Sequence, residues 1–299
     1  MSKDTRSVTV GIDGSRASLD AADWAAREAE RRHLALRLLH AGDEPPAPAR
    51  PPDGEPTRTI LDRAAVQLSY AHPALDIIAR RTDTPAVPAL LAAAAESETV
   101  VLSSRGFSGY SGFVGFLAGS VALAVAAGAE RPVVLVREGE LPEDERMPVD
   151  ENTSPAQAPY LPVALGLDLA RPADDLIGYA FDAAAVRRAP LHVVPAWTPP
   201  PLLRDYVTGV RPPGDAAGQE DDMWRSLGAI LQPWRHKYPE TEVVERVLYG
   251  HAGHHLLKAS TRAGLLVIGR RTSVGSGLGR AAHSVIHHST CPVAVIPHD

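Results

Sequence analysis

Short apolar runs alternate with longer amphipathic stretches along most of this chain. The runs Val8–Asp13 and Thr99–Ser104 are rich in β-branched residues and have the length of buried strands. Between them, residues 18–32 place apolar side chains at helical spacing on one side, with charged residues on the other. This alternation predicts an α/β fold that is built on a parallel sheet.

The chain repeats this order once. VTVGID at Val8–Asp13 recurs as VALGLD at Val163–Asp168, and PVVLV at Pro132–Val136 recurs as PVAVI at Pro292–Ile296. A repeat of this length indicates duplicated domains rather than a solenoid. The 299 residues of the chain also fit two domains of ordinary size.

Each half is expected to contain five strands. Those of the first half are Val8–Asp13, Leu34–His40, Leu75–Ala79, Thr99–Ser104 and Pro132–Val136. Those of the second half are Val163–Asp168, Leu191–Trp197, Glu242–Leu248, Leu265–Gly269 and Pro292–Ile296. Proline-rich loops are expected at Gly42–Arg58 and Thr198–Gly218. Helices of the second half are expected at Asp222–Lys237 and His283–Ser289.

The domain limits follow from this reading. Residues 1–137 form the first expected domain, residues 138–160 a linker, and residues 161–299 the second domain. The linker holds seven acidic residues, four prolines and almost no large apolar side chain. Such a composition predicts an extended, solvated connector.

A glycine-rich loop follows the strand Thr99–Ser104. It contains Gly106 and Gly109, and Gly119-Ser120 then opens an apolar helix. Glycines let the backbone approach an anion, and a helix start adds unpaired N–H groups and the positive end of a dipole. The order of strand, glycine loop and helix therefore predicts a phosphate site, with a loop that binds nothing as the alternative.

The spacing Gly106-x2-Gly109-x9-Gly119-Ser120 resembles the nucleotide-binding signature of the universal stress protein family. It is not the dinucleotide-binding fingerprint, because no GxGxxG opens a helix directly after the first strand. It is not a Walker A loop either, because no GK[ST] is present. The resemblance covers both halves and implies five-stranded parallel sheets of order 3-2-1-4-5, each with helices on both faces. It also implies ATP, with or without Mg²⁺, beyond the carboxyl ends of the strands, in proteins that act in stress response or signalling rather than as enzymes.

The resemblance assigns roles residue by residue in the first half. Asp13 would meet the adenine and ribose end, Gly11 and Ile12 would lie beneath the base, and the Ala41 backbone would meet the adenine edge. The ribose and phosphate positions match Gly106, Gly109, Gly119, Ser120 and Val121. Arg105 is a candidate phosphate ligand, with a solvated loop charge as an equal alternative, and Ser103-Ser104 replace the family's usual Gly-Ser before it.

The second half departs from the signature. Asp168 is kept and Gly275 matches the second glycine, but Thr272 replaces the first. We align His283-Ser284 with the Gly-Ser pair, so that a histidine fills the glycine position after a shortened gap. Asp168, Gly275 and Ser284 therefore form a weaker second set, and we expect a weakened, altered or lost nucleotide site. Arg270, Arg271 and Arg280 are candidates for direct anion binding there.

Histidines gather in the second half without completing a metal site. His251/His255 and His283/His287 have the i, i+4 spacing that suits a metal, but no cysteine or clear carboxylate joins either pair. Exposed or hydrogen-bonded histidines explain them more simply, so no metal is expected. No catalytic constellation is visible either, and the alternatives to nucleotide-dependent signalling are a slow nucleotide-hydrolysing or nucleotide-transferring enzyme and a ligand-free dimerisation scaffold.

The composition of the chain limits the classes of partner that it is expected to bind. The net charge of −6 disfavours nucleic acid, and the single cysteine, Cys291, excludes an internal disulfide framework. No signal-like segment or apolar run of membrane-spanning length occurs, so we expect a soluble cytoplasmic protein without a membrane partner. Pro132–Val136 and Pro292–Ile296 would each end their sheet as an open edge, and the resemblance implies that the two edges pair as a pseudo-dimer. No specific residue supports a homodimer of whole chains, although the fold is compatible with one.

Overall fold

The structure is a computed structural model that describes residues 6–42, 59–106, 116–117, 119–148, 157–196, 216–245, 252–273 and 277–299. The chain forms two compact units, Met1–Leu141 and Pro142–Asp299, and each is described by itself. The expected loop Gly42–Arg58 lies almost entirely outside the described residues, as do Gly109, Gly275 and His251.

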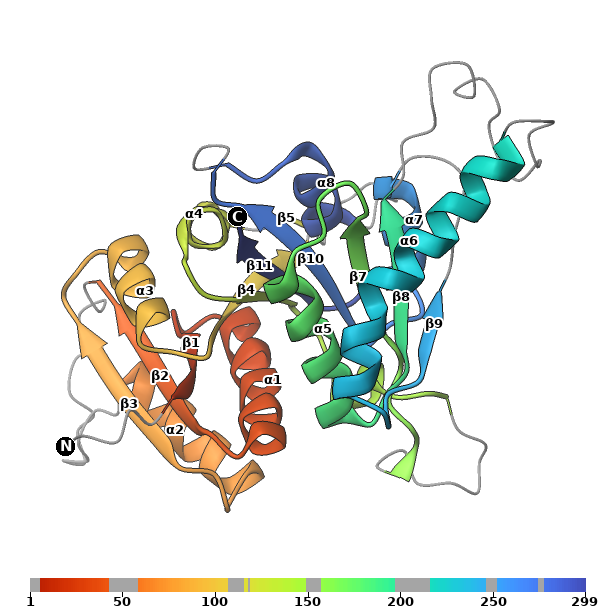
Figure 1. Cartoon of the computed structure of the whole chain (residues 1–299). Helices are drawn as coiled ribbons and strands as arrows, with labels where there is room; N and C mark the ends of the chain where they lie inside the picture. The colour runs from red at the N-terminus through yellow and green to blue at the C-terminus, as the bar shows by residue number, and fades with distance from the viewer. Residues whose placement is uncertain are drawn as a thin grey trace, which may run out of the picture. The chain divides into compact units, whose positions relative to one another are not determined.

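Unit 1 contains a parallel sheet with a short antiparallel addition (Figure 1). Its strands are β1 (Ser7–Gly11), β2 (Ala35–Ala41), β3 (Ile77–Thr82), β4 (Thr99–Gly106), β5 (Phe116–Leu117) and β6 (Val133–Arg137). Its helices are α1 (Arg16–Arg32), α2 (Ile60–Ala71), α3 (Ala86–Ala95) and α4 (Ser120–Gly128). The parallel order is β3-β2-β1-β4-β6, and β5 pairs antiparallel with β4.

Unit 2 repeats this architecture. Its strands are β7 (Val163–Asp168), β8 (Leu191–Ala196), β9 (Val243–Glu245), β10 (Leu265–Arg271) and β11 (Val293–His298). Its helices are η1 (Pro142–Glu145, a 3-10 turn), α5 (Asp174–Arg187), α6 (Ala216–Lys237), α7 (Ala252–Ser260) and α8 (Arg280–His288). The order β9-β8-β7-β10-β11 is parallel throughout. The expected α/β fold with two sheets of order 3-2-1-4-5 is therefore confirmed.

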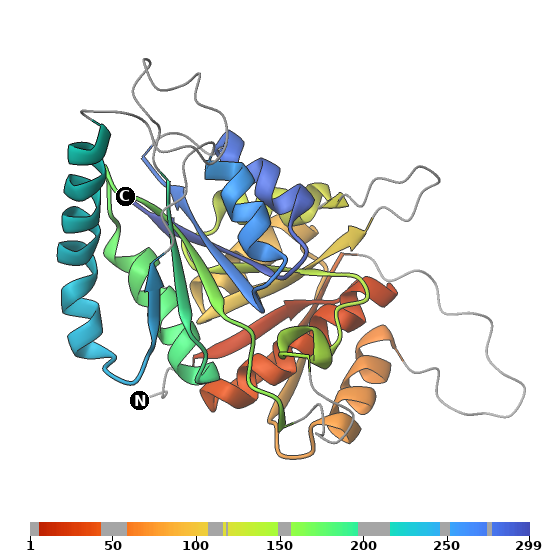
Figure 2. The ribbon, with the colours of Figure 1, turned by 90° about the vertical axis from the view of Figure 1, so that its right-hand side faces the viewer.

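Helices cover both faces of each sheet (Figure 2). In unit 1, α1 packs against α2 and α3 packs against α4; in unit 2 the corresponding pairs are α5 with α6 and α7 with α8. The strands between them are buried on both sides, since the successive residues Val100 and Val101 of β4, which point to opposite faces, are both fully buried. This double burial explains why the central strands read as nearly continuous apolar runs.

The strand registers make residues of the two units correspond. Val8 pairs with Thr99 in unit 1, and Val163 pairs with Leu265 in unit 2. On the other side of these strands, Val100 pairs with Val133 and Leu266 with Val293. Counting along the strands, β4 positions correspond to β10 positions as follows: Ser103 to Gly269, Ser104 to Arg270, Arg105 to Arg271 and Gly106 to Thr272.

The expected limits of β3, α6 and α8 are wrong, and α8 begins at Arg280 instead of His283. The third strand spans Ile77–Thr82 instead of Leu75–Ala79, because this edge strand is held by its ladder to β2 while most of its side chains are exposed. An apolar run is a poor guide on such an exposed edge. Helix α6 begins at Ala216, inside the expected proline-rich loop and before the expected start at Asp222.

The described residues of the segment between the two repeats, 138–148 and 157–160, fold locally. After the turn Pro142–Glu145, the Met147 N–H donates to the Pro159 carbonyl (2.8 Å), and Arg146 donates to the Ala158 carbonyl (2.7 Å). The Arg146 guanidinium also lies 4.1 Å from the centre of the Tyr160 ring. The expectation of an extended linker is therefore wrong for its described residues, because hydrogen bonds and a cation–π contact fold it locally. The limits 138–160 and the pairing of the two edge strands stay predictions.

Candidate functional site

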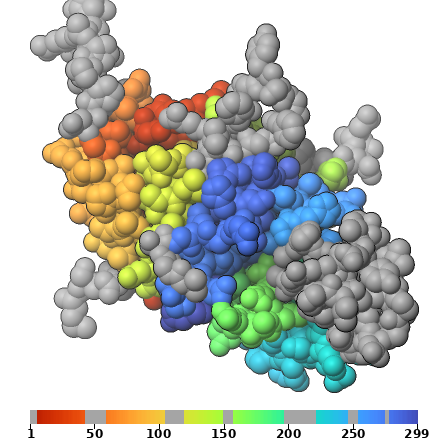
Figure 3. All heavy atoms as spheres, turned by 90° about the horizontal axis from the view of Figure 1, so that it is seen from above, coloured from red at the N-terminus to blue at the C-terminus, as the bar shows by residue number. Residues whose placement is uncertain are grey.

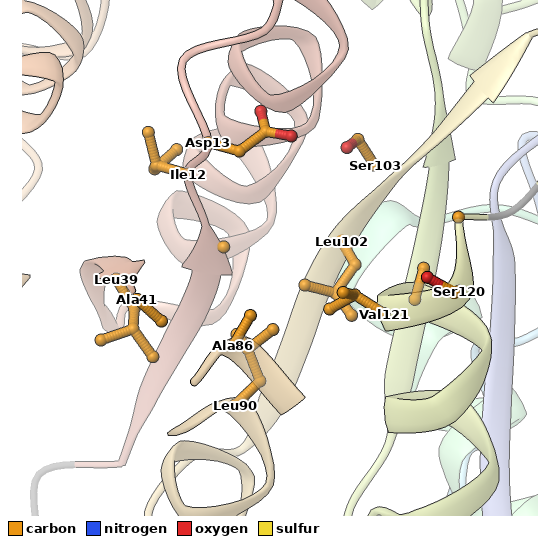
Figure 4. A pocket seen from close by; sticks show the side chains of 13 residues that line it. Ile12, Asp13, Leu39, Ala41, Ala86, Leu90, Leu102, Ser103, Ser120 and Val121 are labelled. Carbon is orange, nitrogen blue, oxygen red and sulfur yellow. The ribbon is translucent and has the colours of Figure 1, made fainter. Parts of the chain in front are cut away.

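A cavity of about 350 Å³ opens in unit 1 beyond the carboxyl ends of β1, β2 and β4 (Figure 4). The first turn of α4 closes one side of it and α3 lies beneath. β1 lies between β2 and β4, so the cavity occupies the point where the strand order reverses, which is the usual ligand position in open α/β sheets.

Most of the residues that the sequence assigned to a ligand line this cavity. They are Gly11, Ile12, Asp13, Ala41, Gly119, Ser120 and Val121. Arg105 and Gly106 end β4, where Gly106 pairs with Phe116 of β5. Gly109 lies outside the described residues.

Sequence reasoning missed the side chains that form the apolar floor. Ala86 and Leu90 of α3 and Leu102 of β4 supply it, and Leu90 and Leu102 are buried. The spacing of Ala86 and Leu90, one helical turn apart, was the available signal, because both had to lie on the side of the helix that faces the sheet. Leu39, Ser103 and Ala122 complete the lining.

Gly11 allows this floor to pack against β1. A Cβ atom at position 11 would lie 2.8 Å from Leu102 Cδ2 and 3.4 Å from Leu90 Cδ2. A side chain there would push the leucine ends into the cavity, because the first separation is shorter than a van der Waals contact. The glycine therefore lets the apolar side chains of the floor lie close against β1.

Asp13 places a carboxylate at the rim, and its orientation is fixed locally. Its Oδ1 accepts hydrogen bonds from the Ser15 N–H (2.9 Å) and the Ser15 hydroxyl (2.5 Å). Ser15 is also the N-cap of α1, where its hydroxyl oxygen accepts from the Ser18 N–H at 3.2 Å. Beneath this turn, the buried His40 ring donates from Nδ1 to the Ile12 carbonyl at 2.7 Å.

Ser15→Ala is expected to lower the free energy of unfolding by about 1 kcal/mol, because α1 loses its capping side chain. Urea denaturation followed by circular dichroism measures this loss. Ser69→Ala is a suitable control, since the exposed Ser69 hydroxyl donates only to the Ala65 carbonyl within α2. Equal stability of the two variants would show that the Ser15 cap contributes nothing.

The start of α4 faces the cavity with its backbone uncovered. Gly119 is the N-cap, with φ −57° and ψ 156°, and no side chain caps the helix. A Cβ atom at Gly119 would meet no atom of the described residues within 4 Å, so these residues leave the space above the first turn open. The N–H groups of this turn and the exposed Ser120 hydroxyl are therefore available to an anion.

The polar atoms of the site lie around its rim. Figure 4 shows Asp13 and Ser103 at the ends of adjacent strands and Ser120 at the start of the helix, while Leu90 and Leu102 lie between and below them. A carboxylate at one end and helix N–H groups at the other give the rim opposite electrostatic character. Such an arrangement can bind a molecule with a flat apolar part, hydroxyl groups and an anionic end.

Unit 2 has a similar strand end but a different helix start. Asp168 ends β7, and its Oδ1 accepts from the Ala170 N–H at 3.0 Å, as Asp13 does from Ser15. Helix α8, however, begins at Arg280 with Gly279 as its N-cap. The alignment of His283-Ser284 with Gly119-Ser120 is therefore wrong, and Ser284 lies inside α8 beyond its first turn.

The glycine of the helix start is kept in unit 2. The loop between β10 and α8 is shorter than the loop between β4 and α4. Helix α8 therefore starts earlier than the expected spacing placed it. Pro292 follows Gly279 at the same distance at which Pro132 follows Gly119, and this signal was present in the sequence. No atom of the described residues lies within 4 Å of a Cβ atom at Gly279, so none of their side chains crowds the helix start at that position.

Arginines occupy two positions of unit 2 that correspond to serines in unit 1. Arg270, which corresponds to Ser104, is 6% exposed, and desolvation by burial lowers the pKa of its guanidinium. Arg280 takes the place of Ser120 at the first position of α8, and both Arg271 and Arg280 are exposed. The two units therefore present different chemistry at equivalent positions.

A further cavity, of about 670 Å³, lies at the amino ends of strands β7 and β10 of unit 2. Leu161 and Pro162 line it just before β7, and Thr261 and Arg262 line it just before β10. In the described part of the chain no group of three or more His, Cys, Asp or Glu side chains is placed to hold a metal. None of the described helices has the length and apolar character needed to cross a membrane.

Comparison with known proteins shows that both halves of the chain match one protein family. The family model described as the universal stress protein family matches residues 5–137 and again residues 159–297. The universal stress protein Rv1996 of Mycobacterium tuberculosis is 28% identical over 98% of this chain and 96% of its own length. The universal stress protein Rv2005c of the same organism is 29% identical over 96% of each chain.

A solved structure matches the fold. The crystal structure of a universal stress protein from Archaeoglobus fulgidus superposes with a TM-score of 0.58, covering 98% of this chain and 97% of that chain. The sequence identity is 16%, so this match bears on the fold. It agrees with the two parallel sheets described above.

Proposed function

This chain belongs to the universal stress protein family, and we propose that its first unit binds ATP or a related adenine nucleotide as a stress-response or signalling module. The cavity at the carboxyl ends of β1, β2 and β4 carries the proposal. It combines an apolar floor, a rim carboxylate and an uncapped helix start. These three features suit a base, a ribose and phosphates, respectively.

The ligand would lie across the cavity from floor to helix. The adenine ring would rest over Gly11, Leu90 and Leu102, with the backbone of Ala41 at its edge. Asp13 would accept hydrogen bonds from the ribose hydroxyls, and such bonds to a charged acceptor are among the stronger ones. The phosphates would meet the first N–H groups of α4 and the Ser120 hydroxyl.

The cavity size agrees with this placement. A volume of about 350 Å³ lies near the lower end of the range typical of small-molecule sites. It suits the base and the ribose, with the phosphates extending along the open rim above Gly119. Mg²⁺ would then be held mainly by phosphate oxygens and water, as is usual for this ion.

Unit 2 is proposed to bind nucleotide more weakly or with another preference. The Asp168 turn and the Gly279 N-cap are retained, but Arg280 stands where Ser120 provides a small hydroxyl. A long cationic side chain at this position changes both the space and the charge at the helix start. The two sites should therefore differ in affinity.

Isothermal titration calorimetry with ATP and Mg²⁺ is expected to report one strong nucleotide site per chain. Two equal sites would show that unit 2 tolerates its arginines, and the absence of any binding would contradict the proposal. Identifying the small molecules that co-purify with the protein gives an independent test, because a bound adenine nucleotide would be released on denaturation.

The proposed role is binding rather than catalysis. Among the described cavity-lining residues Asp13 is the only carboxylate, and its Oδ1 already accepts from the Ser15 N–H. No described lining residue forms a nucleophile–base pair. Sustained ATP turnover in the presence of Mg²⁺ that disappears in Ser120→Ala would instead establish a nucleotide-hydrolysing enzyme.

A further inference from the structure

Helix α8 carries two histidines whose Nε2 atoms are separated by about the distance between two nitrogens that bind one metal ion. His283 and His287 are separated by one helical turn, and their Nε2 atoms lie 3.2 Å from each other. With Zn–N bonds of about 2.0–2.1 Å and a tetrahedral angle, two ligating nitrogens lie about 3.3–3.4 Å apart. The geometry points to a binding site for a divalent transition ion, in the first place Zn²⁺, that both Nε2 atoms hold.

The two rings are tilted toward each other and are not stacked face to face. Their centroids are 4.2 Å apart, farther than the two Nε2 atoms, and their planes differ by 50°. The rings therefore converge at their Nε2 ends. In the absence of metal, one neutral imidazole can donate its Nε2–H to the other, and for both Nε2 atoms to bind an ion that ring would carry its proton on Nδ1 instead.

The fold does not require histidines at these positions. Helix α4 of unit 1 starts from Gly119 as α8 starts from Gly279, so Leu123 and Ala127 occupy the places of His283 and His287. The same architecture thus forms with two apolar residues there. The pair is a feature of unit 2 alone, which favours a specific role over a packing role.

The site is open to solvent. His283 is exposed and His287 is half-buried. Figure 3 shows blue spheres, the colour of the C-terminal part of unit 2 that includes α8, on the face turned to the viewer. An ion can therefore reach the pair without a change in the fold, and its remaining coordination positions would be filled by water.

The ligand set defines the kind of ion. Among the described residues no third His, Cys, Asp or Glu side chain joins the pair. Two imidazoles favour zinc, copper and nickel over magnesium and calcium, which prefer oxygen ligands. A site with two protein ligands should bind reversibly, unlike a closed structural zinc site.

Calorimetric titration of ZnCl₂ into the untagged, nucleotide-free full chain at neutral pH tests the site. We expect one saturable event that His283→Ala and His287→Ala each abolish. His288→Ala is the matched control, because it removes an exposed histidine from the same helix but leaves the pair intact, and it should keep the event. Parent-like zinc binding in the double variant His283→Ala/His287→Ala, or no saturable event in the parent, would overturn the proposal.

Thermal unfolding supplies a second readout. Zinc should raise the melting temperature of the parent and of His288→Ala, because an ion that binds the folded state stabilises it, and EDTA should reverse the shift. His283→Ala should show no such shift while its circular dichroism remains that of the parent. An equal shift in His283→Ala would place the zinc elsewhere. Neither measurement involves nucleotide, so the outcome is independent of the proposed ATP site.

Discussion

Gly119→Val is expected to weaken ATP binding by about tenfold or more without unfolding the chain. The valine side chain would stand over the open first turn of α4, where the phosphates should meet its N–H groups. Hydrogen bonds to charged groups contribute about 1.5–3 kcal/mol each, so losing one of them already lowers affinity by about tenfold or more. Titration calorimetry with ATP measures the change.

The backbone at Gly119 explains why the fold should survive. Its φ of −57° and ψ of 156° are accessible to any residue, and in the described part of the chain no atom lies within 4 Å of the place a Cβ atom would take. Glycine is therefore not needed there for a left-handed conformation. The cost of valine is the ordinary one for an apolar N-cap, about 1 kcal/mol.

Gly279→Val provides a matched control for this prediction. Gly279 is the N-cap of α8, with φ −61° and ψ 157° and the same open surroundings, so valine should have the same local cost. If the strong site lies in unit 1, Gly279→Val keeps parent affinity. Unchanged affinity in Gly119→Val, or an equal loss in both variants, would remove the assignment of the strong site to unit 1.

The fold could be predicted from the sequence because its signals are local and repeated. The strands β1 and β7 carry the same pattern in VTVGID and VALGLD, and both are buried centrally in their sheets. The edge strand β3 was misplaced, because Arg80 and Arg81 belong to it although they are polar. Their backbone pairs with β2, and pairing leaves no mark on side-chain hydrophobicity.

The site was predictable only where a residue acts through its place in a motif. Asp13 and Gly119 were identified because they end a strand and begin a helix, and both line the cavity. Leu90 and Leu102 were missed, since they look like ordinary core residues and acquire a role only when α3 folds over β1 and β4. The start of α8 was misplaced because a loop length had to be assumed where only the folded helix defines its N-cap.

Asp13→Ala is expected to weaken nucleotide binding by about ten- to hundredfold, because the ribose hydroxyls lose a charged acceptor worth about 1.5–3 kcal/mol. The exposed carboxylate contributes this without being part of the core, so the chain should remain folded. Asp13→Asn keeps an oxygen that can accept from the Ser15 N–H but removes the charge, and it should bind with intermediate affinity. Competition by ATP against a fluorescent adenine nucleotide measures all three proteins on one scale.

Asp168→Ala is the matched control, since Asp168 ends β7 in the same kind of turn, with its Oδ1 accepting from the Ala170 N–H. It should leave the strong site intact and affect only a weaker one in unit 2. An Asp13→Ala protein that binds as tightly as the parent would show that the ribose does not meet this carboxylate. A loss in Asp168→Ala with none in Asp13→Ala would move the strong site to unit 2, and the arginines at positions 270, 271 and 280 would then be the residues to replace next.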